Sequence, residues 1–249
     1  RRIRHRLPDR APTVVHDLGC GSGSMGRWLA PLLPGPQHWV LHDRDADLLD
    51  LAVTDPPPAA ADGAAITIST QPGDLTRLRP GDLAGASLLT ASALLDMMTA
   101  AEVEGLVRCC VEVLCPTLLT LSVTGRVVLT PADPLDRALA AAFNDHQRRA
   151  TVRGPLLGPD AVGRAAEEFR LLGAHVTTRP SPWRLDARNG ALTAAWLAGW
   201  VEAACEQRPE LEPAAAAYRE RRAEQLADAR LAVTVDHLDL LAQPAGALR

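Results

Sequence analysis

The sequence predicts a doubly wound α/β fold, in which helices cover both faces of a mostly parallel seven-stranded sheet. Short apolar or β-branched runs alternate with segments of helical composition along the 249 residues. Such alternation favours a parallel sheet, because each connection must return the chain to the edge where the next strand begins. Glycines follow the first run and acidic residues follow several others. This pattern is typical of folds that bind ligands at the carboxyl ends of their strands.

The expected elements follow this alternation. The apolar and β-branched runs indicate strands near residues 13–18, 37–42, 65–69, 86–91, 117–123, 174–179 and 230–241. Helices are expected between them, near residues 24–33, 46–53, 100–114 and 160–172. We therefore expect one domain over residues 1–249, with its core at about 13–124, 160–179 and 230–241. Two segments exceed what this core needs, at about 126–158 and 180–229, and they are expected to be helical insertions on the substrate side.

A glycine-rich segment follows the first expected strand. Asp17 is followed by glycines at three alternate positions, Gly19, Gly21 and Gly23, and then by a segment of helical composition. Alternate glycines let the backbone turn sharply and leave no Cβ between the backbone N–H groups and a ligand. The amino end of the following helix favours an anionic group by roughly 0.3–1 kcal/mol. The segment therefore indicates a loop that binds a nucleotide-type cofactor.

Two classes of cofactor use such a loop. Gly21, Gly23 and Gly26 satisfy the G-x-G-x-x-G spacing of dinucleotide-binding proteins. Asp17 with Gly19, Gly21 and Gly23 instead matches D-x-G-x-G-x-G, and in this the chain resembles the class I S-adenosylmethionine-dependent methyltransferases of bacterial, small-molecule type. The acid favours the second reading. A carboxylate would repel a pyrophosphate, whereas S-adenosylmethionine (SAM) carries an ammonium and a sulfonium that it would attract.

The resemblance implies a Rossmann-like fold in which one of the last two strands is antiparallel. It also implies SAM as cofactor and S-adenosylhomocysteine (SAH) as product. Members of this family usually carry a longer N-terminal helical cap than the dozen or so residues before the first expected strand. We therefore expect part of that cap to be missing from this chain. The resemblance covers about residues 13–124 motif by motif, and the remainder by strand order alone.

Acidic residues after the second and third expected strands are further candidates for the cofactor site. Asp43 stands about twenty residues beyond the glycines, where an acid binds ribose hydroxyls in doubly wound folds. Its neighbour Arg44 joins it as a candidate, although these residues and Asp45 could instead serve to cap the next helix. By resemblance, Asp74 takes the exocyclic amine of adenine and Leu75 packs on the ring. Locally, the same segment also reads as a turn.

The fourth expected strand ends at Ser92 and Ala93. By resemblance, these two residues form the floor between the cofactor and the methyl acceptor. Asp96 follows closely and either lines the acceptor side or caps the helix expected near residues 100–114.

The acceptor site is expected to draw on the insertions. His146 is the leading candidate for a catalytic base, because imidazole titrates near neutral pH and several polar residues accompany it. Arg126, Asn144 and Gln147 are candidates for holding a polar or anionic acceptor, and Trp183 for a lid over the substrate. The alternative for His146 and its neighbours is a solvated helix end.

Composition limits the possible classes. The net charge of −4 argues mildly against nucleic acid as the substrate. The basic opening, Arg1 to Arg10, is expected to be a solvated helix end. No stretch is apolar for long enough to span a bilayer. Five cysteines without a C-x-x-C pair suggest core thiols, no metal site and a reducing cytoplasm.

The expected protein is thus a monomeric or homodimeric enzyme that methylates a small molecule at an oxygen, nitrogen or carbon atom. Three alternatives stay open. An NAD(P)-dependent oxidoreductase would need a proton relay, but one tyrosine and no lysine exclude the commonest pair. An rRNA or tRNA methyltransferase is suggested by residues 55–58, Asp-Pro-Pro-Pro, which lack the aromatic residue that follows in such motifs. The third is a non-catalytic partner subunit with a cofactor fold.

Overall fold

A computed structural model describes residues 12–245 of the chain. The predicted basic opening and N-terminal cap lie outside the described residues. The main sheet has the strand order β3-β2-β1-β4-β5-β10-β8, with β9 paired to β10 at one end. Its strands are β1 (Thr13–Leu18), β2 (Gln37–Asp43), β3 (Ile66–Pro72), β4 (Leu88–Ser92), β5 (Thr117–Thr130), β8 (His175–Pro180), β9 (Trp183–Leu185) and β10 (Ala232–Gln243).

The pairing confirms the predicted topology. β3, β2, β1, β4 and β5 are parallel neighbours, and β10 runs antiparallel to both β5 and β8. Strand order reverses between β1 and β4, so the loops after these two strands diverge to opposite sides and leave a crevice between them. This crevice is where a doubly wound sheet binds its ligand.

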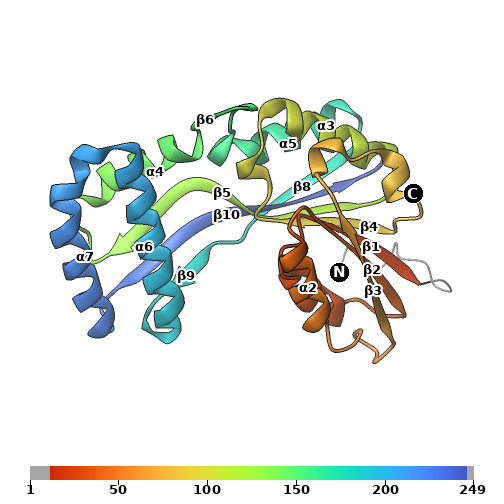
Figure 1. Ribbon diagram of the computed structural model, residues 1–249, viewed down its shortest axis with the longest axis horizontal. Coiled ribbons are helices and arrows are strands. Elements are labelled where there is room, and N and C mark those ends of the chain that lie inside the picture. Colours follow the sequence, from red (N-terminus) through yellow and green to blue (C-terminus); the bar gives the residue numbers. More distant parts are fainter. Residues whose placement is uncertain (1–11, 246–249) are drawn as a thin grey trace.

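Helices cover both faces of this sheet (Figure 1). α1 (Ser24–Leu29) and α2 (Ala46–Thr54) pack on one face, in a core that includes Val15 and Trp39. α3 (Ala100–Glu112) and α5 (Ala161–Leu171) pack on the other, in a core that includes Leu89 and Leu119. The helix expected near 24–33 is divided into α1 and the 3₁₀ helix η2 (Ala30–Leu32), because Pro31 has no N–H with which to continue α1.

The insertions build a third hydrophobic core. α4 (Asp136–Gln147), α6 (Gly190–Gln207) and α7 (Glu212–Ala227) surround the far ends of β5 and β10, away from β1–β3 (Figure 1). Trp200 and Tyr218 are fully buried there. Part of each predicted insertion belongs to the main sheet, because β5 continues to Thr130 and β9 adds to β10.

Short elements complete the chain. A hairpin of β6 (Ala150–Thr151) and β7 (Gly154–Pro155) follows α4. The remaining 3₁₀ helices are η3 (Leu75–Arg77), η4 (Pro80–Leu83), η5 (Leu95–Met97), η6 (Gly158–Asp160), η7 (Ala187–Asn189) and η8 (Pro209–Leu211).

Candidate functional site

The glycine loop turns sharply between β1 and α1. Gly19, Gly21 and Gly23 have positive φ angles of 67°, 52° and 86°, a region that other residues enter only with strain. A Cβ at Gly19 would stand 3.1 Å from Leu94 Cδ1, so a larger residue there would require the Leu94 side chain to shift. The backbone N–H groups of Gly19 and Cys20 both donate to the carbonyl of His42, which ties the loop to the end of β2.

Asp43 holds the glycine loop from the neighbouring strand. Its Oδ2 accepts a hydrogen bond from the Gly21 N–H at 2.8 Å, and its Oδ1 accepts one from the Asp45 N–H at 3.0 Å. Asp45 is the residue that caps α2, through the N–H groups of Asp47 and Leu48. The sequence allowed these acids either to cap the helix or to bind the cofactor. In the structure Asp45 caps α2, and Asp43 lies beside the glycine loop.

A cavity of about 480 Å³ opens at this point. Its walls contain most of the predicted cofactor residues: Gly19, Gly21, Asp43, Arg44, Asp74, Leu75 and Ala93. Leu48, Leu94, Met97 and Met98 add apolar surface. The cavity thus combines carboxylates at Asp43 and Asp74 with apolar side chains. This combination suits a nucleoside, whose hydroxyl and amino groups donate to carboxylates while its base packs on apolar side chains.

Asp74 carries a lowered pKa because its carboxylate accepts hydrogen bonds from the backbone N–H and the hydroxyl of Thr76. It is exposed and therefore negatively charged at neutral pH. The local turn that the sequence suggested is present, and the carboxylate nevertheless faces the cavity.

Asp17 lies beneath the glycine loop and does not line the cavity. It is 1% exposed, and its Oδ1 accepts a hydrogen bond of 2.7 Å from the Thr90 hydroxyl. Its Oδ2 is buried without a partner among the described residues. Burial raises the pKa of this carboxyl to about 7, against the lowering effect of Thr90. The acid that stands open to a ligand beside the loop is Asp43, and Asp17 supports the loop from within.

The end of β4 separates the first cavity from a second one. Ala93 lines the first cavity, whereas Ser92 lines a cavity of about 340 Å³ on the α1 side, together with residues of α1, β5 and β10. Ala93 has a φ angle of +51° and donates its N–H to the Thr120 carbonyl. Strain of roughly 1 kcal/mol or more at a non-glycine residue persists where the surrounding structure enforces it. Strand β4 thus ends in a constrained partition between two cavities.

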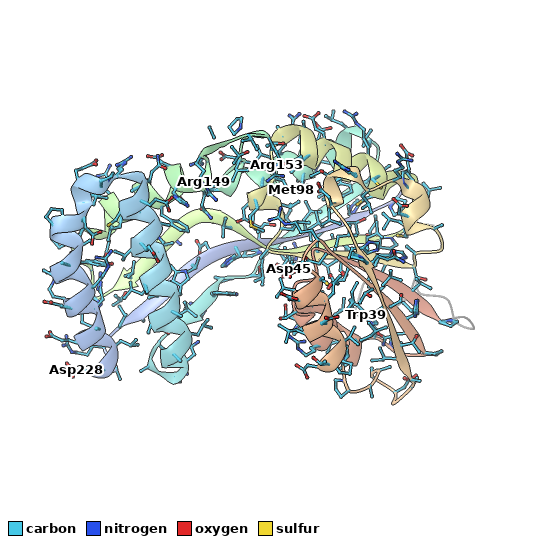
Figure 2. The ribbon with its side chains drawn as sticks, in the orientation of Figure 1. Trp39, Asp45, Met98, Arg149, Arg153 and Asp228 are labelled. Atoms are coloured by element: carbon cyan, nitrogen blue, oxygen red, sulfur yellow. The ribbon has the colours of Figure 1, made fainter. Side chains whose placement is uncertain are left out.

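The hairpin after α4 forms a wall that the sequence did not reveal. Arg149, Thr151, Arg153 and Leu156 line the first cavity, and in Figure 2 Arg149 and Arg153 lie across from Asp45 at the start of α2. Arg153 pairs with Glu102 at 2.5 Å, which holds the hairpin to α3. The length of the insertion indicated an added element, but only the folded chain places it over this cavity.

The predicted acceptor residues before α4 line neither cavity. Asp96 is not among the lining residues of either cavity, its Oδ1 is buried without a described partner, and burial raises its pKa. It does not cap α3, because Thr99 does so in a capping box with Glu102. Arg126 pairs with Asp236 at 2.7 Å on the surface.

The predicted residues of α4 and β9 also serve packing. Asn144 donates to the Gly125 carbonyl, Gln147 packs against Gly158, and the ring of Trp183 lies 5.3 Å from that of His237. His146 faces Glu206 of α6, with 3.9 Å between Nδ1 and the carboxylate. None of these side chains is among the lining residues of the two cavities. This placement gives no support to a catalytic role for His146.

The comparisons with known proteins found matches among solved structures alone. No family model and no curated protein matches the sequence. A SAM-dependent methyltransferase from Methanosarcina mazei superposes with a TM-score of 0.54 and 11% identity, over 97% of this chain and 96% of that one. A putative methyltransferase from Bacillus halodurans gives a TM-score of 0.52 and 13% identity, over 98% of each chain.

A mycolic acid cyclopropane synthase in complex with SAH gives a TM-score of 0.50 and 12% identity, over 94% of this chain and 80% of that one. These identities establish the fold alone. The chain has the Rossmann-like fold of the class I methyltransferases, as the glycine signature predicted. Among the helices of residues 12–245, none is long and apolar enough to cross a membrane.

Proposed function

We propose that the protein is a SAM-dependent methyltransferase that acts on a small molecule. The observation that carries the proposal is the first cavity, where Asp43 is hydrogen-bonded to the glycine loop and Asp74 lines the wall from the end of the neighbouring strand. The fold is shared with SAM-dependent methyltransferases, one of which in the comparisons was solved with SAH. The charge of −4 and the sizes of the two cavities support a small acceptor rather than a nucleic acid.

The residues of the cavity fit this cofactor. Each oxygen of Asp43 accepts one backbone N–H and keeps capacity for a ribose hydroxyl. Leu75 offers an apolar surface to the adenine ring, and Asp74 offers an acceptor to its amino group. Gly19 and Gly21 leave the loop backbone open to the methionine part. When bound, SAM supplies an electrophilic methyl group on a sulfonium.

The chain's own contribution to the reaction is alignment. The constrained end of β4 separates the two cavities, so a cofactor in one would meet an acceptor in the other across Ser92 and Ala93. Holding two reactants in line can supply roughly 7–11 kcal/mol of the barrier reduction. No histidine is among the lining residues of either cavity in the described part of the chain, so we propose that positioning carries more of the acceleration than an imidazole base.

The cysteines support an intracellular, reducing location for this enzyme. All five are buried and free, and none forms a disulfide in the described structure. We therefore propose that the protein works in the cytoplasm.

Calorimetric titration of SAH against Asp43→Asn tests the proposal. The substitution replaces one carboxylate oxygen with an amide that cannot accept from ribose, so we expect the affinity to fall at least tenfold. Asp50→Asn is the matched control, because Asp50 is an exposed acid on the next helix and does not line the cavity. Its affinity should equal that of the wild type. Binding of NAD(P) with no binding of SAM or SAH would contradict the proposal.

A further inference from the structure

The second cavity is built from four elements and one loop. Ser24, Met25 and Trp28 come from α1, and Ser92 from the end of β4. Thr120 and Leu121 of β5, Ser181 after β8, and Asp239 of β10 complete the wall. Asp239 is the one charged side chain among these described lining residues.

A β-bulge shapes this wall. Leu238 pairs with Ser122 and Leu240 pairs with Leu119, so two residues of β5 lie opposite the single residue Asp239. Bulges occur preferentially beside functional sites, where they redirect side chains. Leu121 takes a φ angle of +54° in the bulge, which is a strained conformation for leucine. Its N–H has no backbone acceptor across the strands and donates instead to Asp239 Oδ1 at 3.1 Å.

The carboxylate of Asp239 is held firmly through one oxygen. Oδ1 accepts from the Leu121 N–H and also from the Ser181 hydroxyl at 2.7 Å. No donor among the described residues is paired with Oδ2, and no arginine or histidine is among the lining residues of the cavity. Arg179 lies opposite Asp239 in the register of β8 and β10, but its guanidinium donates to the Thr178 carbonyl and no ion pair joins the two side chains within residues 12–245. A partly buried carboxylate with a free oxygen favours a cationic ligand, which would replace the lost hydration.

An aromatic ring lies in the same cavity. The Trp28 side chain is 59% exposed, although tryptophan normally buries its large apolar surface. Met25 and Leu121 add apolar contacts around it. Indole faces attract cations and also stack on flat apolar groups. The cavity therefore presents a fixed negative charge together with an apolar surface.

From these observations we infer that the second cavity binds a small organic amine, whose ammonium group pairs with Asp239 Oδ2 and whose apolar body packs on Trp28. The inference rests on the proposed function, because it assigns this amine as the class of molecule that receives the methyl group. The ammonium nitrogen paired with Asp239 has no lone pair, so a second nucleophilic atom of the acceptor would form the bond to the methyl carbon while the sulfonium S–C bond breaks and SAH leaves. It defines recognition of the acceptor by charge, and Asp239 and Trp28 are its specificity-determining residues.

Calorimetry with phenethylamine on the SAH-saturated protein tests this inference. Phenethylamine carries an ammonium group on a flat apolar body, 2-phenylethanol is its neutral counterpart and 3-phenylpropionate its anionic counterpart. We expect the wild type to bind phenethylamine at least tenfold more tightly than either counterpart. Equal binding of the three compounds, tighter binding of the acid, or no binding of the amine would overturn the inference.

Asp239→Asn is the decisive variant, because the asparagine Oδ1 can still accept from Leu121 and Ser181 while an NH₂ group replaces the free oxygen. We expect it to bind phenethylamine at least tenfold more weakly than the wild type. Trp28→Ala, at an exposed position that should not disturb folding, should also weaken binding severalfold. Asp236→Asn is the matched control on the same strand, because Asp236 pairs with Arg126 and does not line the cavity.

Unchanged amine binding in Asp239→Asn would overturn the inference. SAH binding separates this result from a failure of the proposed function. If SAH binds normally and the amine does not respond to Asp239→Asn, the acceptor assignment alone is wrong. If SAH does not bind the wild type, the proposed function is wrong, and binding of phenethylamine to the free protein still tests the cavity.

Discussion

Single residues with unusual backbone angles lead to the site. Four non-glycine residues have positive φ angles within residues 12–245: Ala93, Leu114, Leu121 and Ala229. Leu114 and Ala229 each follow a helix at the position where a left-handed residue commonly ends it. Ala93 and Leu121 have no such explanation. They line the first and second cavities respectively, so local strain marks both sides of the partition at the end of β4.

Asp17 allows a prediction at the residue scale. Its pKa is raised from 3.8 to about 7 in the folded protein, so the folded state holds the proton more tightly than the unfolded chain. The contribution of this carboxyl to stability is therefore most favourable at low pH and is lost as the pH rises from about 4 to about 7. Asp17→Asn removes this dependence. We therefore compare the free energies of unfolding of the variant and the wild type at about pH 5 and about pH 8. The difference should change in favour of the variant by roughly 1–3 kcal/mol between these two pH values.

Urea unfolding of both proteins at the two pH values measures this difference. Thr90→Val is the companion variant, because the Thr90 hydroxyl is the described donor to Asp17. A stability difference between wild type and Asp17→Asn that is the same at both pH values would contradict the prediction.

At the scale of elements, the hairpin β6–β7 converts an open crevice into a walled cavity. Leu157, just after it, donates its N–H to the Met98 carbonyl, and Leu156 forms a bridge with Thr99. Arg153 adds the ion pair with Glu102. These contacts join an insertion after β5 to the segment after β4. The insertion was expected on the acceptor side, but the residues that it contributes line the first cavity and none of them lines the second.

The ion pair of Arg153 is open to test. In Arg153→Ala the hairpin loses its side-chain link to α3, and we expect SAH affinity to fall twofold to fivefold. The size is limited because ion pairs near the surface contribute about 1 kcal/mol or less. Hydrogen exchange at residues 150–155 should become faster. Arg164→Ala, which breaks ion pairs on the outer surface of α3 and α5, should change neither quantity.

At the scale of the whole molecule, one sheet supports three hydrophobic cores. Two of them cover the faces of its parallel part, and the long antiparallel pair β5–β10 extends into the third, among α4, α6 and α7 (Figure 1). A buried cluster joins two of these helices. Arg222 of α7 is fully buried and pairs with Asp136 of α4 at 2.5 Å, and the hydroxyl of Tyr218 donates to the same carboxylate. Arg222 also donates to the Pro131 carbonyl at 2.6 Å.

Removing this arginine should destabilise the protein strongly. Arg222→Ala leaves Asp136 without its buried partner charge, and we expect the free energy of unfolding to fall by about 3–5 kcal/mol. Arg221→Ala is the matched control, because the neighbouring Arg221 pairs with Asp133 while its side chain is 48% exposed. Its cost should be about 1 kcal/mol or less. Chemical unfolding compares the two variants, and equal losses of stability would contradict the prediction.

The sequence by itself determined the sheet, its helices and the residues that follow β1, β2, β3 and β4 in the wall of the first cavity. These features depend on alternation and on short spacings: Asp43 reaches Gly21 across 22 residues, between adjacent parallel strands. A spacing of this length predicts which residues lie close together, because the strand–helix–strand unit has a nearly constant geometry. Asp17 shows the limit of such reading, since its position in the motif was clear but its burial beneath the loop was not.

Only the tertiary structure decided the second cavity and the hairpin wall. Leu121 and Asp239 are 118 residues apart, and their contact depends on the register of β5 against β10 and on a bulge of one residue. Arg153 and Glu102 are 51 residues apart and meet because an insertion folds back over η5. Composition and periodicity carry no information on register between distant segments, since a slip of one residue reverses which side chains face the site. The sequence likewise could not show which way the polar residues of α4 face. It predicted His146 as a candidate base, whereas in the structure His146 faces Glu206 of α6.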